Sequence, residues 1–224
     1  MRNRLLVTVV TLACTVFAAL PAFASTALMD YVGFGWESYG QVPDAGDLTT
    51  SSPGDVLSIT AVVDELDPLF GVDLGLEEAT IFITDLVSQG EVPIGGGAYM
   101  IQYTGGTMSV YQDLSNDHFW GVSPDATTFI NGSLLLKGEF TEFTMYFYGA
   151  GQGAYEGRLN LVDGTAVSIC NDCAYSFGGA FTYDVGAQIP EGYDIQVDGV
   201  LEVDSVVSTT ENSFGAIKSL FGSN

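Results

Sequence analysis

The segment AYMIQYTGGTMSVYQD (residues 98–113) carries the clearest fold signal in the chain. Apolar and polar residues alternate on both sides of Gly105 and Gly106, which is typical of two half-buried β-strands. Glycine adopts positive φ angles without the steric cost of a Cβ atom, so two consecutive glycines favour a two-residue turn. The sequence therefore predicts an antiparallel hairpin that turns at Gly105–Gly106.

Short alternating segments of this kind, separated by glycine and proline, continue through residues 25–207. In FTEFTMYFY (140–148), one face of the expected strand carries Phe143, Met145 and Phe147, and the other carries Phe140, Tyr146 and Tyr148. A strand that is apolar on both faces is typical of the centre of a sandwich or barrel. No segment has the composition of a linker, so we expect one all-β domain. The fold we predict is a jelly-roll-like β-sandwich of about ten strands, and the alternative is a closed β-barrel with a ligand cavity.

Residues 1–24 have the features of a secretory signal peptide. Two arginines precede an uncharged apolar stretch, and the small-x-small motif AFA (22–24) follows it. The apolar stretch is shorter than the roughly 20 residues that span a bilayer. We therefore expect cleavage near Ala24 and export of residues 25–224 from a bacterial cell, to the periplasm, the cell surface or the medium.

The exported part is strongly acidic. The whole chain has 28 acidic and 5 basic residues, and the signal peptide holds two of the basic ones and no acid. The remaining 3 basic and 28 acidic residues give a formal charge of −25. Such a surface does not neutralise a phosphate backbone or an anionic bilayer, so we exclude nucleic acid and anionic membrane surfaces as partners.

Calcium is the one cofactor that the sequence suggests, because it binds carboxylate and carbonyl oxygens. Asp113, Asn116 and Asp117 are the candidate ligands, and a second group of acids lies within residues 64–78. Neither group matches an EF-hand loop or a nonapeptide repeat. Solvated acidic loops are the simpler interpretation of both.

Catalytic motifs are scarce. His118 is the single histidine, no G-x-S-x-G element is present, and one histidine is too few for a histidine-built zinc site. Glycoside hydrolysis needs only a pair of carboxyl groups. Glu139 and Glu142, three apart on one expected strand, should face opposite sides of it, and Glu37 has no identifiable partner.

Two further features concern aromatic residues and cysteines. In MDYVGFGWES (29–38), Trp36 shares a strand face with Val32 and Phe34, while Trp120 lies in a polar loop. Both tryptophans are candidates for stacking on a sugar, although most such rings belong to a core. Cys170 and Cys173 form a C-x-x-C motif that, in an exported chain, predicts a structural disulfide.

Residues 208–224 are predicted to form a short amphipathic helix. Ser208 to Glu211 fits a capping box. The apolar stripe of the helix consists of Phe214, Ile217, Leu220 and Phe221. About a dozen residues do not hold a helix alone in water, so the stripe should dock, either on the domain itself or on a partner that recognises the tail.

The ending ENSFGAIKSLF (211–221) resembles that of an uncharacterised group of predicted secreted bacterial β-rich proteins. Their tail follows the pattern aromatic-Gly-x-x-Lys-x-Leu-aromatic, and they carry segments similar to YTGGTMSVYQD, TFINGSLLLKGEFTEF and PEGYDIQVDG of this chain. The resemblance covers most of residues 25–224. It implies an exported β-domain and brings no activity or functional residue with it.

We therefore expect an exported, non-catalytic domain with a structural or interaction role at the cell surface or outside the cell. Its partners are expected to be further copies of the chain or a surface glycan. The alternative function is a carbohydrate- or small-ligand-binding module, and the second alternative is a secreted glycoside hydrolase.

Overall fold

The computed structural model describes residues 25–39, 42–43, 51–168, 173–183, 186 and 188–204. Strands account for most of this part of the chain. They are β1 (Ser25–Tyr39), β2 (Val42–Pro43), β3 (Val56–Leu66), β4 (Glu78–Gly95), β5 (Ala98–Asp113), β6 (Ser133–Gly149), β7 (Gln152–Asp163), β8 (Ala174–Thr182) and β9 (Ile195–Asp204). Two 3₁₀ turns, η3 (Pro68–Phe70) and η4 (Thr127–Phe129), lie in the connections. In the described residues, no helix has the length and apolar character needed to cross a membrane.

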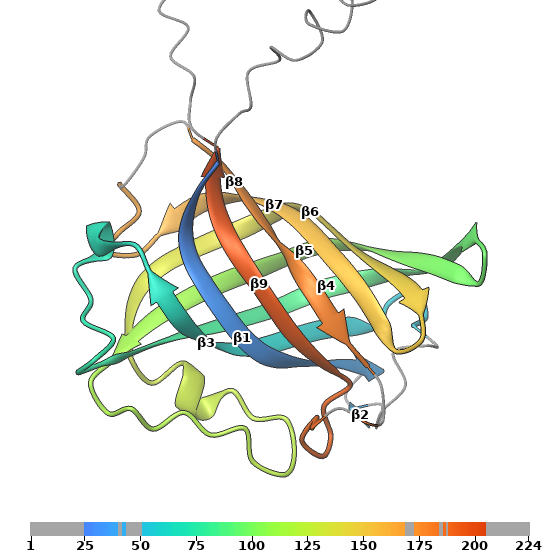
Figure 1. The fold of residues 1–224 in the computed structure, drawn as a ribbon, viewed down its shortest axis with the longest axis horizontal. Coiled ribbons are helices and arrows are strands. Elements are labelled where there is room, and N and C mark those ends of the chain that lie inside the picture. Colours follow the sequence, from blue (N-terminus) through green and yellow to red (C-terminus); the bar gives the residue numbers. More distant parts are fainter. Residues whose placement is uncertain are drawn as a thin grey trace, which may run out of the picture. The chain divides into compact units, whose positions relative to one another are not determined.

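The strands close into an antiparallel β-barrel (Figure 1). Successive strands from β3 to β9 pair with one another, and β1 pairs with both β3 and β9, so eight strands form the barrel wall. The short β2 pairs only with the end of β1. The all-β class and the barrel alternative are confirmed, whereas the sandwich interpretation is not. Alternation along single strands is the same in both folds, and only the β1–β9 pairing separates them.

The hairpin predicted at Gly105–Gly106 is wrong. Both glycines lie inside the continuous strand β5, with φ values of 71° and 89°. A Cβ atom on Gly106 would lie 2.5 Å from Leu86 Cδ2, so the glycine permits close packing against β4 rather than a reversal of the chain. The chain reverses instead at Gly95–Gly97, between β4 and β5.

The barrel interior is apolar and rich in aromatic rings. The inward faces carry aliphatic side chains from β3 and β4 and aromatic ones from β5 to β8. Phe143 lies near the centre of the aromatic group and contacts the rings of Tyr103, Phe140, Tyr155 and Phe177. The protein's own side chains thus pack together in the space that a ligand-binding barrel leaves open.

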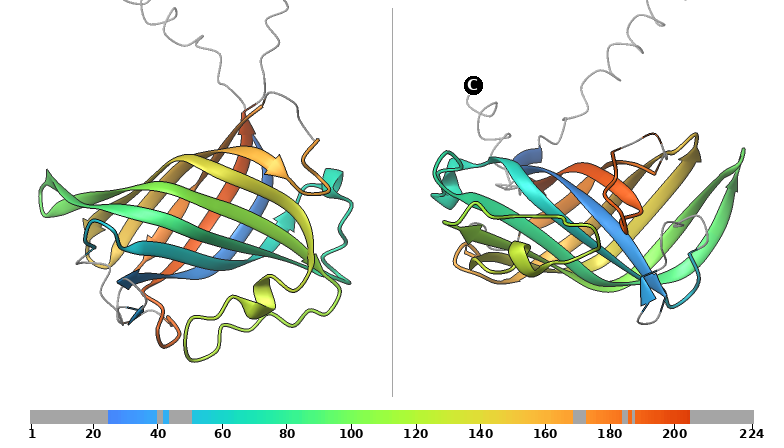
Figure 2. Two further views of the ribbon diagram at one scale, coloured as in Figure 1. Left: turned by 180° about the vertical axis from the view of Figure 1, so that it is seen from behind. Right: turned by 90° about the horizontal axis from the view of Figure 1, so that it is seen from below.

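A long connection, residues 114–132, covers part of the outer wall (Figure 2). Phe129 of η4 is fully buried, and its carbonyl oxygen accepts a hydrogen bond from Thr80 Oγ1 of β4 at 2.8 Å. The Trp120 ring packs edge-on against Phe34 of β1 at 5.0 Å. Outward apolar residues of the first strands are therefore covered by this connection, which we call the covering loop.

Candidate functional site

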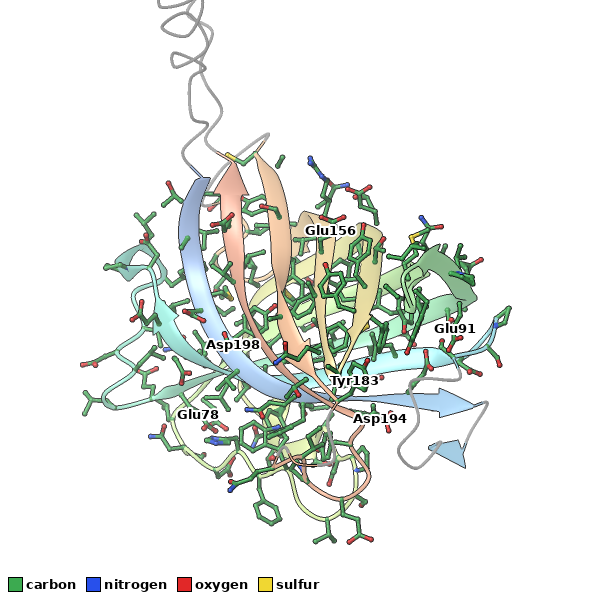
Figure 3. All side chains as sticks on the ribbon, turned by 45° about the vertical axis from the view of Figure 1, so that its right-hand side comes forward. Glu78, Glu91, Glu156, Tyr183, Asp194 and Asp198 are labelled. Carbon is green, nitrogen blue, oxygen red and sulfur yellow. The ribbon has the colours of Figure 1, made fainter. Side chains whose placement is uncertain are left out.

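Three carboxylates converge where the covering loop leaves the barrel. Glu78 begins β4, Asp113 ends β5, and the two residues are partners in the antiparallel register. Asp117 follows in the covering loop. One carboxylate oxygen of each residue lies within 4.8 Å of the others, and we call this group the acidic cluster (Glu78 is labelled in Figure 3).

Glu78 anchors the beginning of the covering loop. Its Oε1 accepts hydrogen bonds from the backbone N–H groups of Asp117 and His118, at 2.9 and 3.0 Å. Its Oε2 lies 2.6 Å from His118 Nδ1. The single histidine of the chain therefore helps to attach the covering loop to the barrel through the buried carboxylate of Glu78.

Asp113 is, with Glu78, one of the two buried members of the acidic cluster. Its side chain is only 7 % exposed. Its Oδ1 accepts from the backbone N–H of Ser115 at 2.8 Å, whereas Oδ2 is buried and has no hydrogen-bond partner. A buried carboxylate oxygen without a donor is energetically costly and requires compensation.

The sequence-based calcium candidates are partly brought together. Asp113 and Asp117 both belong to the acidic cluster, while the Asn116 side-chain amide donates to the carbonyl oxygen of Leu76 at 3.2 Å. Glu78 was a candidate as part of the other acidic segment (64–78), and its position opposite Asp113 depends on a strand register that the sequence does not show. In the other acidic segment, Asp67 and Asp73 accept backbone hydrogen bonds from Leu69 and Gly75, as turn-forming residues do.

A second group of acids is buried at one end of the barrel. Glu37 of β1 is 4 % exposed, and its Oε1 accepts from Ser51 Oγ at 2.8 Å and Tyr103 OH at 3.1 Å. Its backbone N–H donates to Asp194 Oδ2 at 2.7 Å. Burial raises the pKa of Glu37 to about 7, although the Ser51 and Tyr103 hydrogen bonds act in the opposite direction.

This buried group differs from a hydrolytic carboxylate pair. The side chains of Glu37, Asp55 and Asp194 are all buried, and each carboxylate accepts a hydrogen bond from another residue of the fold. Glycosidases place their two carboxyl groups in a cleft that admits a sugar. The sequence indicated Glu37 as a lone acid, and its partners come from three remote segments.

Glu139 and Glu142 were expected on opposite faces of their strand, and this was wrong. Both are exposed on β6, because the pairing of β6 with β7 shifts register between Phe140 and Glu142. The extra residue of this bulge restarts the alternation. Glu142 then forms an exposed ion pair with Arg158, whose Nε lies 2.9 Å from Glu142 Oε1.

The two tryptophans belong to one aromatic group, to which the covering loop contributes Trp120 and strand β1 contributes Phe34 and Trp36. Trp36 meets the Tyr193 ring at 5.5 Å, and Trp120 contacts Phe34, His118 and Phe129 at 5.0 to 5.5 Å. Both side chains are half-buried. The ring that is open to solvent is their neighbour Phe119, which is 70 % exposed.

Several predicted features lie outside the described residues. These are the signal peptide (1–24), Cys170 and the tail (208–224), including Phe214, Ile217, Leu220 and Phe221. Cys173 lies partly buried just before β8. The disulfide, the cleavage near Ala24 and the helical tail therefore remain predictions.

No protein-family model, curated protein or solved structure matches the chain. The resemblance to secreted β-rich proteins accordingly stays an expectation.

Proposed function

We propose that this chain is an exported, non-catalytic β-barrel with a structural role, and that it associates with further copies of itself through the β4–β5 hairpin. The observation that carries the proposal is the tip of this hairpin, residues 92–97, which we call the arm. Every residue of the arm is exposed, and the arm projects from the barrel beyond Glu91 (Figures 1 and 3).

The arm is apolar in an otherwise acidic molecule. Val92 is 44 % exposed and Ile94 is 47 % exposed, and the stretch from residue 92 to residue 112 contains no charged residue. Strand β4 pairs with β3 only as far as Val87, so the hairpin extends past its neighbour on that side. Exposed apolar residues gathered on a projecting element are typical of an interaction site.

Charge favours the arm over the barrel wall as the contact. Two copies with a formal charge of −25 each repel one another when their walls approach. A contact through projecting, uncharged arms keeps the acidic walls apart while it buries apolar side chains. Full burial of one Val or Ile side chain is worth about 1.5–3 kcal/mol.

The barrel interior supports a surface role rather than binding inside the barrel. Stacked and edge-on ring pairs, such as Tyr31 with Phe177 and Phe147 with Phe181, run through the interior. A ligand would have to displace these contacts. The surface arm needs no such rearrangement.

The test is sedimentation velocity of the exported chain over about a hundredfold range of concentration, at low and at high salt. We expect association that strengthens with salt, and its loss in Ile94→Asp. Val162→Asp is the matched control, because Val162 is 46 % exposed on β7, away from the arm. A wild-type chain that stays monomeric under all conditions, or equal behaviour of the two variants, would contradict the proposal.

A further inference from the structure

We propose that Glu78, Asp113 and Asp117 bind one calcium ion, which fastens the covering loop to the barrel. The proposal does not depend on self-association through the arm. It places the site at the junction of β4, β5 and the loop, and it joins Asp113 and Asp117 of one predicted acidic group with Glu78 of the other.

The spacing of the oxygens suits a common ion. Calcium binds oxygen ligands at about 2.3–2.6 Å, so two ligands of one ion lie up to roughly 5 Å apart. The three carboxylate oxygens of the acidic cluster lie within 4.8 Å of one another. Backbone carbonyl groups and water complete such a site in other proteins.

The second observation is the unpartnered oxygen of Asp113. Asp113 Oδ2 is buried without a hydrogen-bond donor, although the residue sits among two further carboxylates. Bringing like charges together in a poorly solvated place is unfavourable unless a cation joins them. An ion bound between the three carboxylates would supply the missing partner.

Positive charge near the acidic cluster is limited. In the described part of the chain, the one basic side chain in contact with a cluster member is His118, whose Nδ1 lies 2.6 Å from Glu78 Oε2. The described cation Arg158 pairs instead with Glu142, across strands β7 and β6. One histidine does not balance three carboxylates.

The donor set favours calcium over softer metals. Carboxylate oxygens are hard ligands that suit calcium and magnesium, whereas zinc and copper prefer sites with nitrogen or sulfur. Magnesium requires a near-ideal octahedron and releases its water reluctantly. A site made by a strand start, a strand end and a loop is better matched to the irregular coordination of calcium.

The test follows thermal unfolding in EDTA, in calcium chloride and in magnesium chloride, with ionic strength kept equal by sodium chloride. We expect calcium to raise the melting temperature of the wild type. Asp113→Asn should lose this increase and at least about tenfold in calcium affinity measured by calorimetry. Asp198→Asn, an exposed acid on β9, is the matched control and should respond as the wild type does (Figure 3).

The order of stabilities separates a metal ligand from a merely structural residue. In EDTA, Asp113→Asn should be at least as stable as the wild type, because the substitution removes an uncompensated buried charge. In calcium, the wild type should become the more stable protein. An Asp113→Asn variant that is less stable in both conditions would indicate a structural role and overturn the proposal.

A spectroscopic probe tests the position of the ion. The centre of the Trp120 ring lies 5.1 Å from that of the His118 ring, and His118 is hydrogen-bonded to Glu78. Trp36 is the other tryptophan of the chain. In a Trp36→Phe background, terbium should show luminescence sensitised by Trp120 that calcium displaces. Luminescence that persists in Asp113→Asn, or a melting temperature that millimolar calcium leaves unchanged, would refute the site.

Discussion

The hydroxyl groups of Tyr31 and Tyr155 lie 2.7 Å apart inside the barrel and form a hydrogen bond between β1 and β7. These strands are not neighbours in the sheet, so the bond crosses the barrel interior. Burial raises the pKa of both tyrosines far above the usual value. Both hydroxyls therefore stay protonated, and each depends on the other within an apolar core.

This pairing predicts strongly non-additive substitutions. Tyr31→Phe or Tyr155→Phe leaves one buried hydroxyl without its partner, which should lower the free energy of unfolding by about 1–3 kcal/mol. The double variant removes both hydroxyls and should cost clearly less than the sum. Urea denaturation of the four proteins measures the coupling, and additive effects would show that the hydrogen bond contributes nothing specific.

Gly199 provides the space that the tyrosine pair occupies. A Cβ atom on Gly199 would lie 2.2 Å from Tyr155 OH and 2.6 Å from Tyr31 OH. Gly199→Ala should therefore destabilise the barrel by about 1–3 kcal/mol or more. The neighbouring Gly178→Ala is the control, because its Cβ atom would approach nothing closer than 3.1 Å. Equal thermal shifts in the two variants would contradict this explanation.

Alternation with a period of two was enough to predict an all-β domain. Phe143, Met145 and Phe147 were expected on one strand face, and all three are buried in the barrel. Phe140 was expected on the opposite face with Tyr146. The bulge before Glu142 turns it inward instead, where its ring lies 5.3 Å from Phe143. A one-residue insertion in the pairing is invisible in the alternation itself.

Features that depend on pairing between remote strands could not be predicted. The barrel closes because β1 pairs with β9, and the acidic cluster forms because Glu78 pairs with Asp113 in the β4–β5 register. The sequence marks both segments as strands but does not fix their register. Gly105–Gly106 shows the same limit, since a glycine pair serves a turn or a close strand contact equally well.

The raised pKa of Glu37 predicts a specific pH dependence of stability. The protonated form is favoured in the folded protein, where the pKa is about 7, compared with a reference value of 4.5. Protonation of Glu37 therefore contributes about 3 kcal/mol to the free energy of unfolding. This contribution is fully present below pH 4.5 and is lost as the pH rises to about 7.

The measurement compares the wild type with Glu37→Gln, which keeps an oxygen for Ser51 and Tyr103 but does not ionise. We expect the variant to gain stability relative to the wild type between pH 4.5 and 7 and to hold that gain above pH 7. Glu139→Gln, at an exposed site on β6, is the control and should run parallel to the wild type. A Glu37→Gln curve that also runs parallel would show that Glu37 ionises in the barrel as it does in water.

Phe129 is predicted to hold the covering loop to the barrel. Its side chain is fully buried, and the centre of the Trp120 ring lies 5.5 Å from that of the Phe129 ring. Its carbonyl oxygen accepts a hydrogen bond from Thr80 Oγ1. Phe129→Ala should remove about 3–5 kcal/mol from the free energy of unfolding or release the loop locally. Phe119→Ala, at a residue that is 70 % exposed in the same loop, should change stability by less than about 0.5 kcal/mol.

Tryptophan fluorescence distinguishes local release of the loop from global unfolding. A loop released before global unfolding exposes Trp120 to water while the far-ultraviolet circular dichroism of the barrel persists. If Phe129→Ala leaves both the fluorescence and the unfolding curve unchanged, the loop is held by other contacts than this ring.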